Sequence, residues 1–409
     1  EAQSVEQICS FRISLRTSMG SHCCTRAPPY LALVLVCLFD VYFHPPFEVN
    51  PARYSTTQRA AATLAAPPWQ VFVDSFSFLV PALIIDTNLL RSIIDGARPS
   101  EEPGSRLIVA VEDRFRGLKI AEKAENVDVI FYSKSQSNRD YWLFELGNEK
   151  RAMRPFETYS TSLVFLPSDI QAFLEDWSHS RVIECHVLLQ RNSTERRSIP
   201  LAFTSQMAEL RDFVKERKAR LLLAGGTLLG WYRECSLISH TRDIDFFVRA
   251  EDYNPSILAD LDAKESPYRV SRIFGLPSDS YELTVLDKKS PEISIDLFFL
   301  YTNSNESYVG GLDWYTRKKY KWTYPKITHL CAADLLGHLF HVPCNAEEVL
   351  DMEYGNWRED AASADFVWYK SHENVRESGF YTSEEMREMR PPGWRWVNDL
   401  VGFLVRSAA

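Results

Sequence analysis

Two aspartates within an apolar run limit how residues 221–248 can fold. The run LLLAGGTLLGWYRECSLISHTRDIDFFV begins with a hydrophobic stretch, turns at a pair of glycines and ends with Asp243 and Asp245 on either side of Ile244. Side chains two positions apart on a β-strand point to the same face. Both carboxylates therefore share one surface. An unpaired carboxylate is expensive to bury, so this strand requires a compensating charge.

A second apolar strand with an inward aspartate follows in the segment EISIDLFFLY, residues 292–301, where Asp296 occupies the polar face. If the two strands are neighbours, Asp243, Asp245 and Asp296 converge, and each like-charge pair would cost about 4 kcal/mol at about 4 Å and an effective dielectric of about 20. Oxygen ligands without histidine or cysteine predict a Mg²⁺ or Mn²⁺ site. The alternative is that Asp243 caps a turn and pairs with a nearby arginine, leaving Asp296 isolated.

The glycine pair suits a phosphate-binding turn. Gly225 and Gly226 lie between the predicted strand 221–224 and a predicted helix capped by Thr227. Glycines let backbone amides approach a phosphate, and the positive end of the helix dipole lies behind them. The pattern suits phosphate binding by these three residues, although many ordinary strand-to-helix turns also carry two glycines. Arg233, on the same helix, is predicted to contact a phosphate or an aspartate, with a supporting salt bridge as the alternative.

A basic and aromatic segment lies further along the chain. Lys318 and Lys319 follow Arg317 within the sequence WYTRKKYKW, which suits a phosphate or sugar approached by aromatic faces. A solvated surface loop is the alternative. The histidines and cysteines of residues 329–344 lack a standard zinc spacing, and CAADLLGHLF, 331–340, is predicted to be a helix, so a zinc site is disfavoured.

The N-terminal part predicts membrane targeting. Basic residues precede an apolar run, and no acidic residue occurs between Glu6 and Asp40. By the positive-inside rule, 1–29 form a cytosolic tail, 30–47 a signal anchor and 48–68 a stem, with the remainder luminal. A cleaved signal peptide is the alternative, because the apolar run is shorter than a typical span of about 20 residues.

Sequons and cysteines agree with a luminal location. Asn192 and Asn305 begin N-glycosylation triplets. An even number of cysteines follows the predicted anchor, which permits disulfides in an oxidising compartment, although buried free thiols remain an alternative and the pairing is open. These cysteines are Cys185, Cys235, Cys331 and Cys344.

The chain is predicted to be an α/β (α+β) protein with two folded domains. Residues 69–200 alternate probable strands, beginning with WQVFVDSF at 69–76, with helical stretches, which predicts an N-terminal α/β domain. Residues 201–409 open with an amphipathic helix over 205–220 and form the second domain, with a mixed sheet. The net charge of −9 argues against a nucleic-acid binder with a broad cationic face.

Several motifs in order carry a family resemblance. GGTLLGWYRE, DID and IDLFF are followed by GGLDWYTRKKYKWTYPK (310–326), HVPC (341–344) and EYGNWRED (353–360). Together they resemble the LicD and fukutin family of nucleotidyltransferase-fold phosphotransferases, and its fukutin branch in particular, over roughly 205–375. Ser239 departs from the family pattern, which usually has proline before the aspartate strand.

The resemblance implies a single-pass type II enzyme of the Golgi or ER membrane with a nucleotidyltransferase-like catalytic domain. It implies transfer of an alcohol phosphate from a CDP-alcohol, CDP-ribitol in the fukutin branch, to an O-mannosyl-type glycan of a glycoprotein, with release of CMP. Asp243 and Asp245 then resemble the metal-binding pair and Asp296 the third carboxylate. One aspartate would accept the proton of the attacking hydroxyl while the metal neutralises the diphosphate.

Two other functions stay open. The DID motif also suits a glycosyltransferase that uses a UDP-sugar, and a homologue without catalysis would serve as a Golgi scaffold for partner transferases. Luminal transferases often associate, so a homo-oligomer or a complex with other Golgi enzymes is a further expectation.

Overall fold

The computed structural model describes most of the chain after the predicted stem. The described residues are 68–97, 106–122, 125–135, 138–189, 196–359 and 367–391. The predicted cytosolic tail and signal anchor, and Asn192, lie outside them. Within these ranges no helix is long and apolar enough to cross a membrane.

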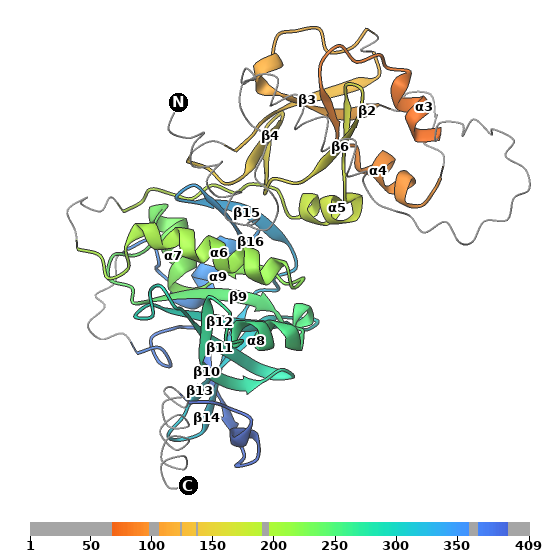
Figure 1. Cartoon of the computed structure of the whole chain (residues 1–409). Helices are drawn as coiled ribbons and strands as arrows, with labels where there is room; N and C mark the ends of the chain where they lie inside the picture. Colours follow the sequence, from red (N-terminus) through yellow and green to blue (C-terminus); the bar gives the residue numbers. More distant parts are fainter. Residues whose placement is uncertain are drawn as a thin grey trace, which may run out of the picture. The chain divides into compact units, whose positions relative to one another are not determined.

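The first half of the described chain forms a seven-stranded mixed sheet (Figure 1). Its strands are β1 (Ala82–Ile84), β2 (Leu107–Glu112), β3 (Val127–Ser133), β4 (Trp142–Leu146), β5 (Glu149–Met153), β6 (Thr158–Thr161) and β7 (Val164–Pro167). Its helices are α3 (Pro68–Asp74), the 3₁₀ helix η1 (Asp113–Phe115), α4 (Thr87–Ile94) and α5 (Ile170–Ser178). The strand order is β5-β4-β3-β2-β1-β7-β6, with β2/β3 and β1/β7 parallel.

Burial explains these elements. The inner strands β1 and β2 are apolar along almost their whole length and are buried, as expected for strands covered on both faces. Asp86 begins α4, where its carboxylate accepts hydrogen bonds from the amides of Asn88 and Leu89. The predicted strand over 69–76 is wrong, since α3 occupies Pro68–Asp74 and begins with proline, a residue favoured in a first helical turn.

The second half forms a ten-stranded sheet. Its strands are β8 (Leu221–Leu223), β9 (Asp243–Arg249), β10 (Tyr268–Leu276), β11 (Asp279–Asp287), β12 (Ser294–Thr302), β13 (Ser307–Asp313), β14 (Lys318–Tyr324), β15 (Leu330–Leu335), β16 (His338–Pro343) and β17 (Val375–Phe380). Its helices are η2 (Leu201–Phe203), α6 (Thr204–Lys215), α7 (Gly225–Glu234), η3 (Ala250–Asp252), α8 (Pro255–Leu261), α9 (Ala346–Tyr354) and η5 (Glu385–Arg387).

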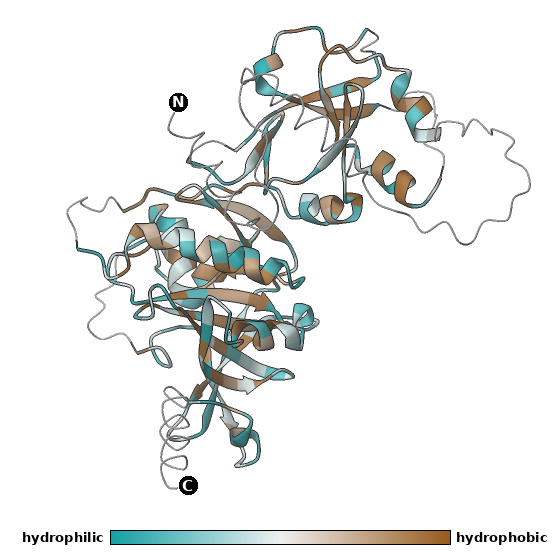
Figure 2. Cartoon of the chain, viewed as in Figure 1, coloured by the Kyte–Doolittle hydropathy of each residue, from teal (hydrophilic) through white to brown (hydrophobic). Residues whose placement is uncertain are grey.

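The order of this sheet is β15-β16-β8-β9-β12-β13-β14-β17, and the β10–β11 hairpin joins it through β12. Parallel and antiparallel pairs coexist, since β9 is parallel to β12 and antiparallel to β8. Helix α6 buries Met207, Leu210 and Val214 and shows hydrophilic residues on the face visible in Figure 2. Mixed sheets with covering helices confirm the α/β prediction. The predicted helix over residues 331–340 is wrong, because this segment forms the β15–β16 hairpin.

Residues 180–183 connect the two sheets by backbone hydrogen bonds. On one side, the amide of Val182 donates to Lys150 of β5 at 2.8 Å. On the other, the amide of Ala332 of β15 donates to Arg181 at 2.7 Å, and that of Ile183 donates to Ala332 at 3.1 Å. This segment therefore pairs with the edge strand of each sheet, and it satisfies backbone groups that an open edge would expose.

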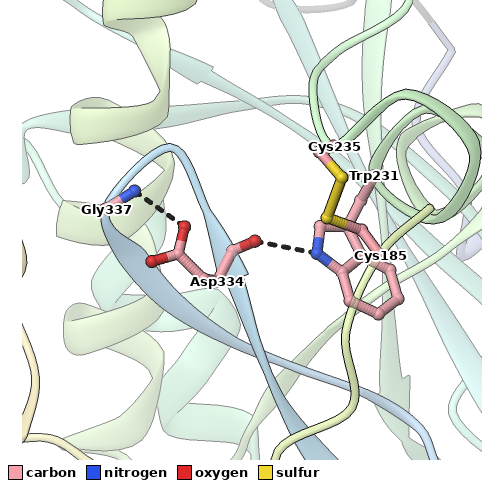
Figure 3. The surroundings of a disulfide bond; sticks show 5 residues. All are labelled: Cys185, Trp231, Cys235, Asp334 and Gly337. Atoms are coloured by element: carbon pink, nitrogen blue, oxygen red, sulfur yellow. Dashed lines mark hydrogen bonds between the residues drawn. A yellow bond between two sulfur atoms is a disulfide. The ribbon is translucent and has the colours of Figure 1, made fainter. Parts of the chain in front are cut away.

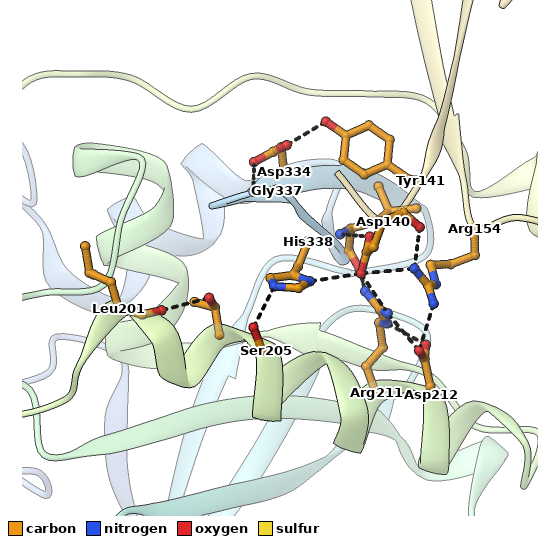
Figure 4. Close-up of polar contacts among 12 residues, drawn as sticks. Asp140, Tyr141, Arg154, Leu201, Ser205, Arg211, Asp212, Asp334, Gly337 and His338 are labelled. Carbon is orange, nitrogen blue, oxygen red and sulfur yellow. Dashed lines mark hydrogen bonds and ion pairs between the residues drawn. The ribbon is translucent and has the colours of Figure 1, made fainter. Parts of the chain in front are cut away.

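A side-chain network reinforces the same junction (Figure 4). Asp140, which precedes β4, lies 3.1 Å from an Nη of both Arg154 and Arg211 and 3.0 Å from Nδ1 of His338. It also accepts the amide of Leu339 at 2.9 Å. Arg211 lies on α6 and is 6% exposed, so the network is largely removed from solvent. One carboxylate thus ties the first sheet to α6 and to the β15–β16 hairpin.

Both disulfides support the second sheet. Cys331–Cys344 joins β15 to the end of β16, and Cys185–Cys235 joins the segment after the first sheet to the end of α7. The pairing that the sequence left open is therefore 185–235 and 331–344. Figure 3 shows Cys185–Cys235 beside Trp231, whose indole Nε1 donates to the carbonyl of Asp334 at 2.8 Å. Helix α7 is thereby held against the β15–β16 hairpin.

Candidate active site

Three aspartates meet at adjacent strands in the centre of the second sheet. Strands β9 and β12 are parallel, with Asp245 opposite Asp296 and Asp243 opposite Ser294. One carboxylate oxygen from each aspartate lies within 4.8 Å of the other two. Asp296 is buried, Asp245 is half-buried and Asp243 is exposed. The convergence expected from the strand pattern is therefore present, while the catalytic role of these residues stays a prediction.

The glycine pair holds Asp245 in place. The amide of Gly226 donates to Oδ2 of Asp245 at 3.1 Å, and the amide of Asp245 donates to Oγ1 of Thr227 at 2.9 Å. Gly225 has φ +46°, and a Cβ there would lie 2.8 Å from Oδ2 of Asp245. Helix α7 begins at Gly225, so the helix starts earlier than predicted and Thr227 is not its cap. The phosphate-binding role predicted for these residues stays a prediction, and their observed contacts are with Asp245.

Replacing Gly225 by alanine is expected to disturb the aspartates more than the fold. The new Cβ has to displace the Asp245 carboxylate, and displacements of about 1 Å can reduce an enzyme's rate about 10²-fold. We expect Mn²⁺ affinity, measured by titration calorimetry, to fall together with activity. Gly226→Ala is the matched control, because its Cβ would lie at an ordinary 3.6 Å from the same oxygen. Equal losses in the two variants would contradict this account.

Asp296 is held from the β10–β11 hairpin. The hydroxyl of Thr284 donates to its Oδ1, and Nη2 of Arg272 lies 3.3 Å from its Oδ2. The same Nη2 forms an ion pair with Glu282. Burial raises the pKa of Glu282 to about 7, while Arg272 opposes that shift. None of these three residues was predicted from the sequence to belong to the site.

The electrostatics of the cluster favour a bound cation. Burial raises the pKa of Asp245 well above its usual value, and the charges of Asp243 and Asp296 raise it further. Burial also raises the pKa of Asp296, although Arg272 and Thr284 lower it. Full ionisation of the three carboxylates is thus unfavourable without added positive charge. Their oxygen-only donor set fits Mg²⁺ or Mn²⁺.

The other cationic residues predicted for the site contact partners other than the three aspartates. Arg233 has a side chain that is 4% exposed, and its Nη1 donates to the carbonyls of Trp357 and Glu359, each at 3.1 Å. A side chain so deeply buried anchors α7 to that segment, and the donor contact predicted for it stays a prediction. Lys318 pairs with Glu377 of β17 at 2.7 Å.

Lys319 likewise points to acidic neighbours. Its Nζ lies 3.5 Å from Glu385 and 4.1 Å from the ring centre of Tyr381. Within the described part of the chain, neither Lys318 nor Lys319 forms a salt bridge with the three aspartates. Both ammonium groups have carboxylate partners, and their predicted contact with donor phosphate stays a prediction.

Helix α9 contributes a buried acid that the sequence analysis did not assign. Burial raises the pKa of Glu353 to about 8. Its charge acts on Asp245, and burial together with Glu353 and Asp245 raises the pKa of Tyr354. The EYGNWRED motif contains both residues, but the spacing of residues within it did not predict a chemical role for either. Only the packing of α9 against α7, β14 and β16 brings them into the electrostatic field of the site.

Comparison with known proteins gives this geometry a context. The LicD/FKTN/FKRP nucleotidyltransferase domain matches residues 218–345, which include all three aspartates. The uncharacterized protein T07A5.1 of Caenorhabditis elegans is 32% identical over 371 residues, covering 88% of this chain and 96% of that protein. The chain belongs to the LicD/FKTN/FKRP family. The family resemblance drawn from the sequence motifs is thus confirmed.

Other matches extend the comparison. The W02B3.4-like N-terminal domain matches residues 68–184, the region of the seven-stranded sheet. The uncharacterized protein W02B3.4 of Caenorhabditis elegans is 31% identical over 77% of this chain and 83% of its own length. The ribitol-5-phosphate transferase FKTN of Homo sapiens is 30% identical over 236 residues, or 55% of this chain, and the match covers half of FKTN. This similarity supports a phosphotransferase in general terms.

Proposed function

We propose that this chain transfers an alcohol phosphate, ribitol 5-phosphate, from a CDP-alcohol to a hydroxyl of an O-mannosyl-type glycan on a glycoprotein, releasing CMP. The convergence of Asp243, Asp245 and Asp296, within the segment that matches the nucleotidyltransferase domain, carries the proposal. The similarity to FKTN supports the choice of ribitol phosphate.

The three aspartates would hold the divalent metal, Mg²⁺ or Mn²⁺. When bound, the metal supplies positive charge that neutralises the diphosphate and the developing charge on CMP. The protein's own residues position the reaction: Gly226 fixes the Asp245 carboxylate. Asp243, the exposed member, would accept the proton of the acceptor hydroxyl. The acceptor oxygen then bonds to the phosphorus of the alcohol phosphate. At the same time, the bond between this phosphorus and the oxygen that leaves with CMP breaks.

We also propose a luminal location, with residues 30–47 as the membrane anchor and the Golgi as the compartment. All four cysteines beyond the proposed anchor are paired, which supports an oxidising environment. Asn305 is exposed in the turn between β12 and β13, so it is accessible for glycosylation.

A donor screen with the purified full chain tests the activity. We expect CMP release from CDP-ribitol in the presence of Mn²⁺ or Mg²⁺, less from CDP-glycerol and CDP-choline, and none after chelation with EDTA. Release of UDP from UDP-sugars, without CMP release from any CDP-alcohol, would establish the glycosyltransferase alternative. Absence of turnover with every donor, combined with retained binding to partner transferases, would favour a scaffold.

A further inference from the structure

A guanidinium group completes a row of polar side chains across four strands. Arg272 of β10 lies opposite Thr284 of β11, Thr284 lies opposite Asp296 of β12, and Asp296 lies opposite Asp245 of β9. Directly opposed residues on neighbouring strands project from the same face of a sheet. Arg272 therefore shares the surface on which the aspartates converge, although it lies on a hairpin that carries no recognised motif.

Its immediate contacts fix the guanidinium at the edge of the aspartate cluster. Nη2 forms ion pairs with Glu282 and, at 3.3 Å, with Asp296. The Cζ atom lies 4.9 Å from the ring centre of Phe274, so the aromatic ring supports the guanidinium. Glu282 is 4% exposed, whereas the Arg272 side chain is 25% exposed. The buried acid thus holds a cation that still reaches the surface.

Arg272 retains unused hydrogen-bonding capacity. An arginine has five N–H donors. Both hydrogen bonds of this guanidinium use Nη2, so Nη1 donates to no other described residue, and Nε is buried without an acceptor. A planar guanidinium with free donors suits a phosphate group, which accepts two parallel hydrogen bonds from it.

The charge balance favours a cation of this kind. Three carboxylates and one divalent metal leave a net negative charge, and a diphosphate donor adds more. Among the described residues, Arg272 is the cationic side chain that forms a salt bridge with these aspartates. If a metal balances the charge of Asp296, the ion pair between Arg272 and Asp296 can break. The ion pair between Arg272 and Glu282 would still orient the guanidinium.

We propose that Arg272 binds phosphate oxygens of the donor diphosphate beside the three aspartates, with Glu282 and Phe274 as its positioning residues. This inference rests on the proposed function, since it assigns a residue to the diphosphate of that donor. It adds a phosphate contact from the β10–β11 hairpin, where the sequence had pointed to Arg233, Lys318 and Lys319.

Binding of CDP to the full chain tests this assignment without turnover. Arg272→Gln is expected to weaken CDP binding in the presence of Mn²⁺ by at least about tenfold, and Arg272→Lys to recover part of the loss because it restores charge without the planar fork. Cytidine binding should stay within about twofold of wild type, and Mn²⁺ binding measured without nucleotide should not weaken, because the substitution removes a positive charge beside Asp296. Arg269→Gln is the matched control, an exposed arginine on the same strand.

The possible outcomes separate this inference from the proposed function. Weakened CDP binding with undiminished Mn²⁺ binding, in variants that still unfold cooperatively, supports the phosphate contact. Unchanged CDP binding in Arg272→Gln, or a parallel loss of Mn²⁺ and CDP binding in both Arg272 variants, overturns it and leaves Arg272 a structural partner of Glu282. If the wild-type chain releases CMP from CDP-ribitol in that case, the proposed function stands. Failure of the wild-type chain to bind CDP would overturn both.

Discussion

Replacing Asp245 by asparagine is expected to abolish CMP release and to make the metal-free protein more stable. Asp245 lies between the other two aspartates, since it is opposite Asp296 and two residues from Asp243 on the same face. Asparagine keeps the shape and an acceptor for the Gly226 amide but removes the charge that holds a metal. We expect the rate to fall by more than about 10³-fold, which corresponds to about 4 kcal/mol of lost transition-state stabilisation.

The stability gain follows from the direction of the pKa shift. Burial, and then the charges of Asp243 and Asp296, raise the pKa of Asp245 above its usual value. A carboxyl group with a raised pKa in the folded state favours folding at low pH, and this contribution is lost as the pH rises through the folded pKa. In EDTA at pH 7, Asp245→Asn should therefore unfold with a higher free energy than wild type.

Thermal melts in EDTA between pH 4 and pH 8 measure this difference, which should grow with pH. Asp243→Asn is the matched control. This exposed aspartate should also be needed for activity, but removing its charge should stabilise the metal-free protein less than removing the charge of Asp245. A metal-free Asp245→Asn variant that is less stable than wild type at pH 7 would show that Asp245 has a structural role, and the argument for a metal at this site would fail.

The sequence predicted the aspartates because their placement depends on a short-range rule. Alternation along one strand puts Asp243 and Asp245 on the same face, and the second apolar strand with Asp296 needs only to lie beside the first. The residues that hold Asp296 depend on longer-range geometry. Arg272 reaches its position through β10, whose pairing with β11 contains two register shifts. A shift of one residue reverses the face of every side chain, so alternation could not place it.

The β15–β16 hairpin shows where local preference was overridden. CAADLLGHLF is rich in helix-forming residues, which led to the helix prediction. Its turn places Leu336 at φ +55° and Gly337 at φ +88°, a left-handed pair without the usual asparagine. The hairpin is supported by its neighbours: residues 180–183 pair with β15, β8 pairs with β16, and Cys331–Cys344 joins its two strands. None of these contacts is local in sequence.

Removing the Asp140 carboxylate is expected to have the largest effect on stability. Asp140→Ala leaves Arg211, which is 6% exposed, without one of its two carboxylate partners, and it also removes the acceptor for His338 and for the amide of Leu339. Breaking a buried ion pair by deleting one partner typically costs about 3 to 5 kcal/mol, and the lower end applies here because Asp140 is 20% exposed and Arg211 keeps Asp212 as a partner. We expect a loss of that size in urea unfolding at pH 7. Asp128→Ala, which breaks an exposed pair with Arg106, should cost under about 1 kcal/mol.

The pH dependence gives an independent measure of the same network. Burial alone would raise the pKa of Asp140, but the hydrogen bond from His338 and the charges of Arg211 and Arg154 outweigh it and lower the pKa to about 2. A lowered folded pKa means that the stabilisation is present above the usual value near 4 and is lost as the pH falls toward 2. The difference between wild type and Asp140→Ala should therefore shrink between pH 4 and pH 2. A constant difference over that range would show that Asp140 acts through its shape and not through its charge.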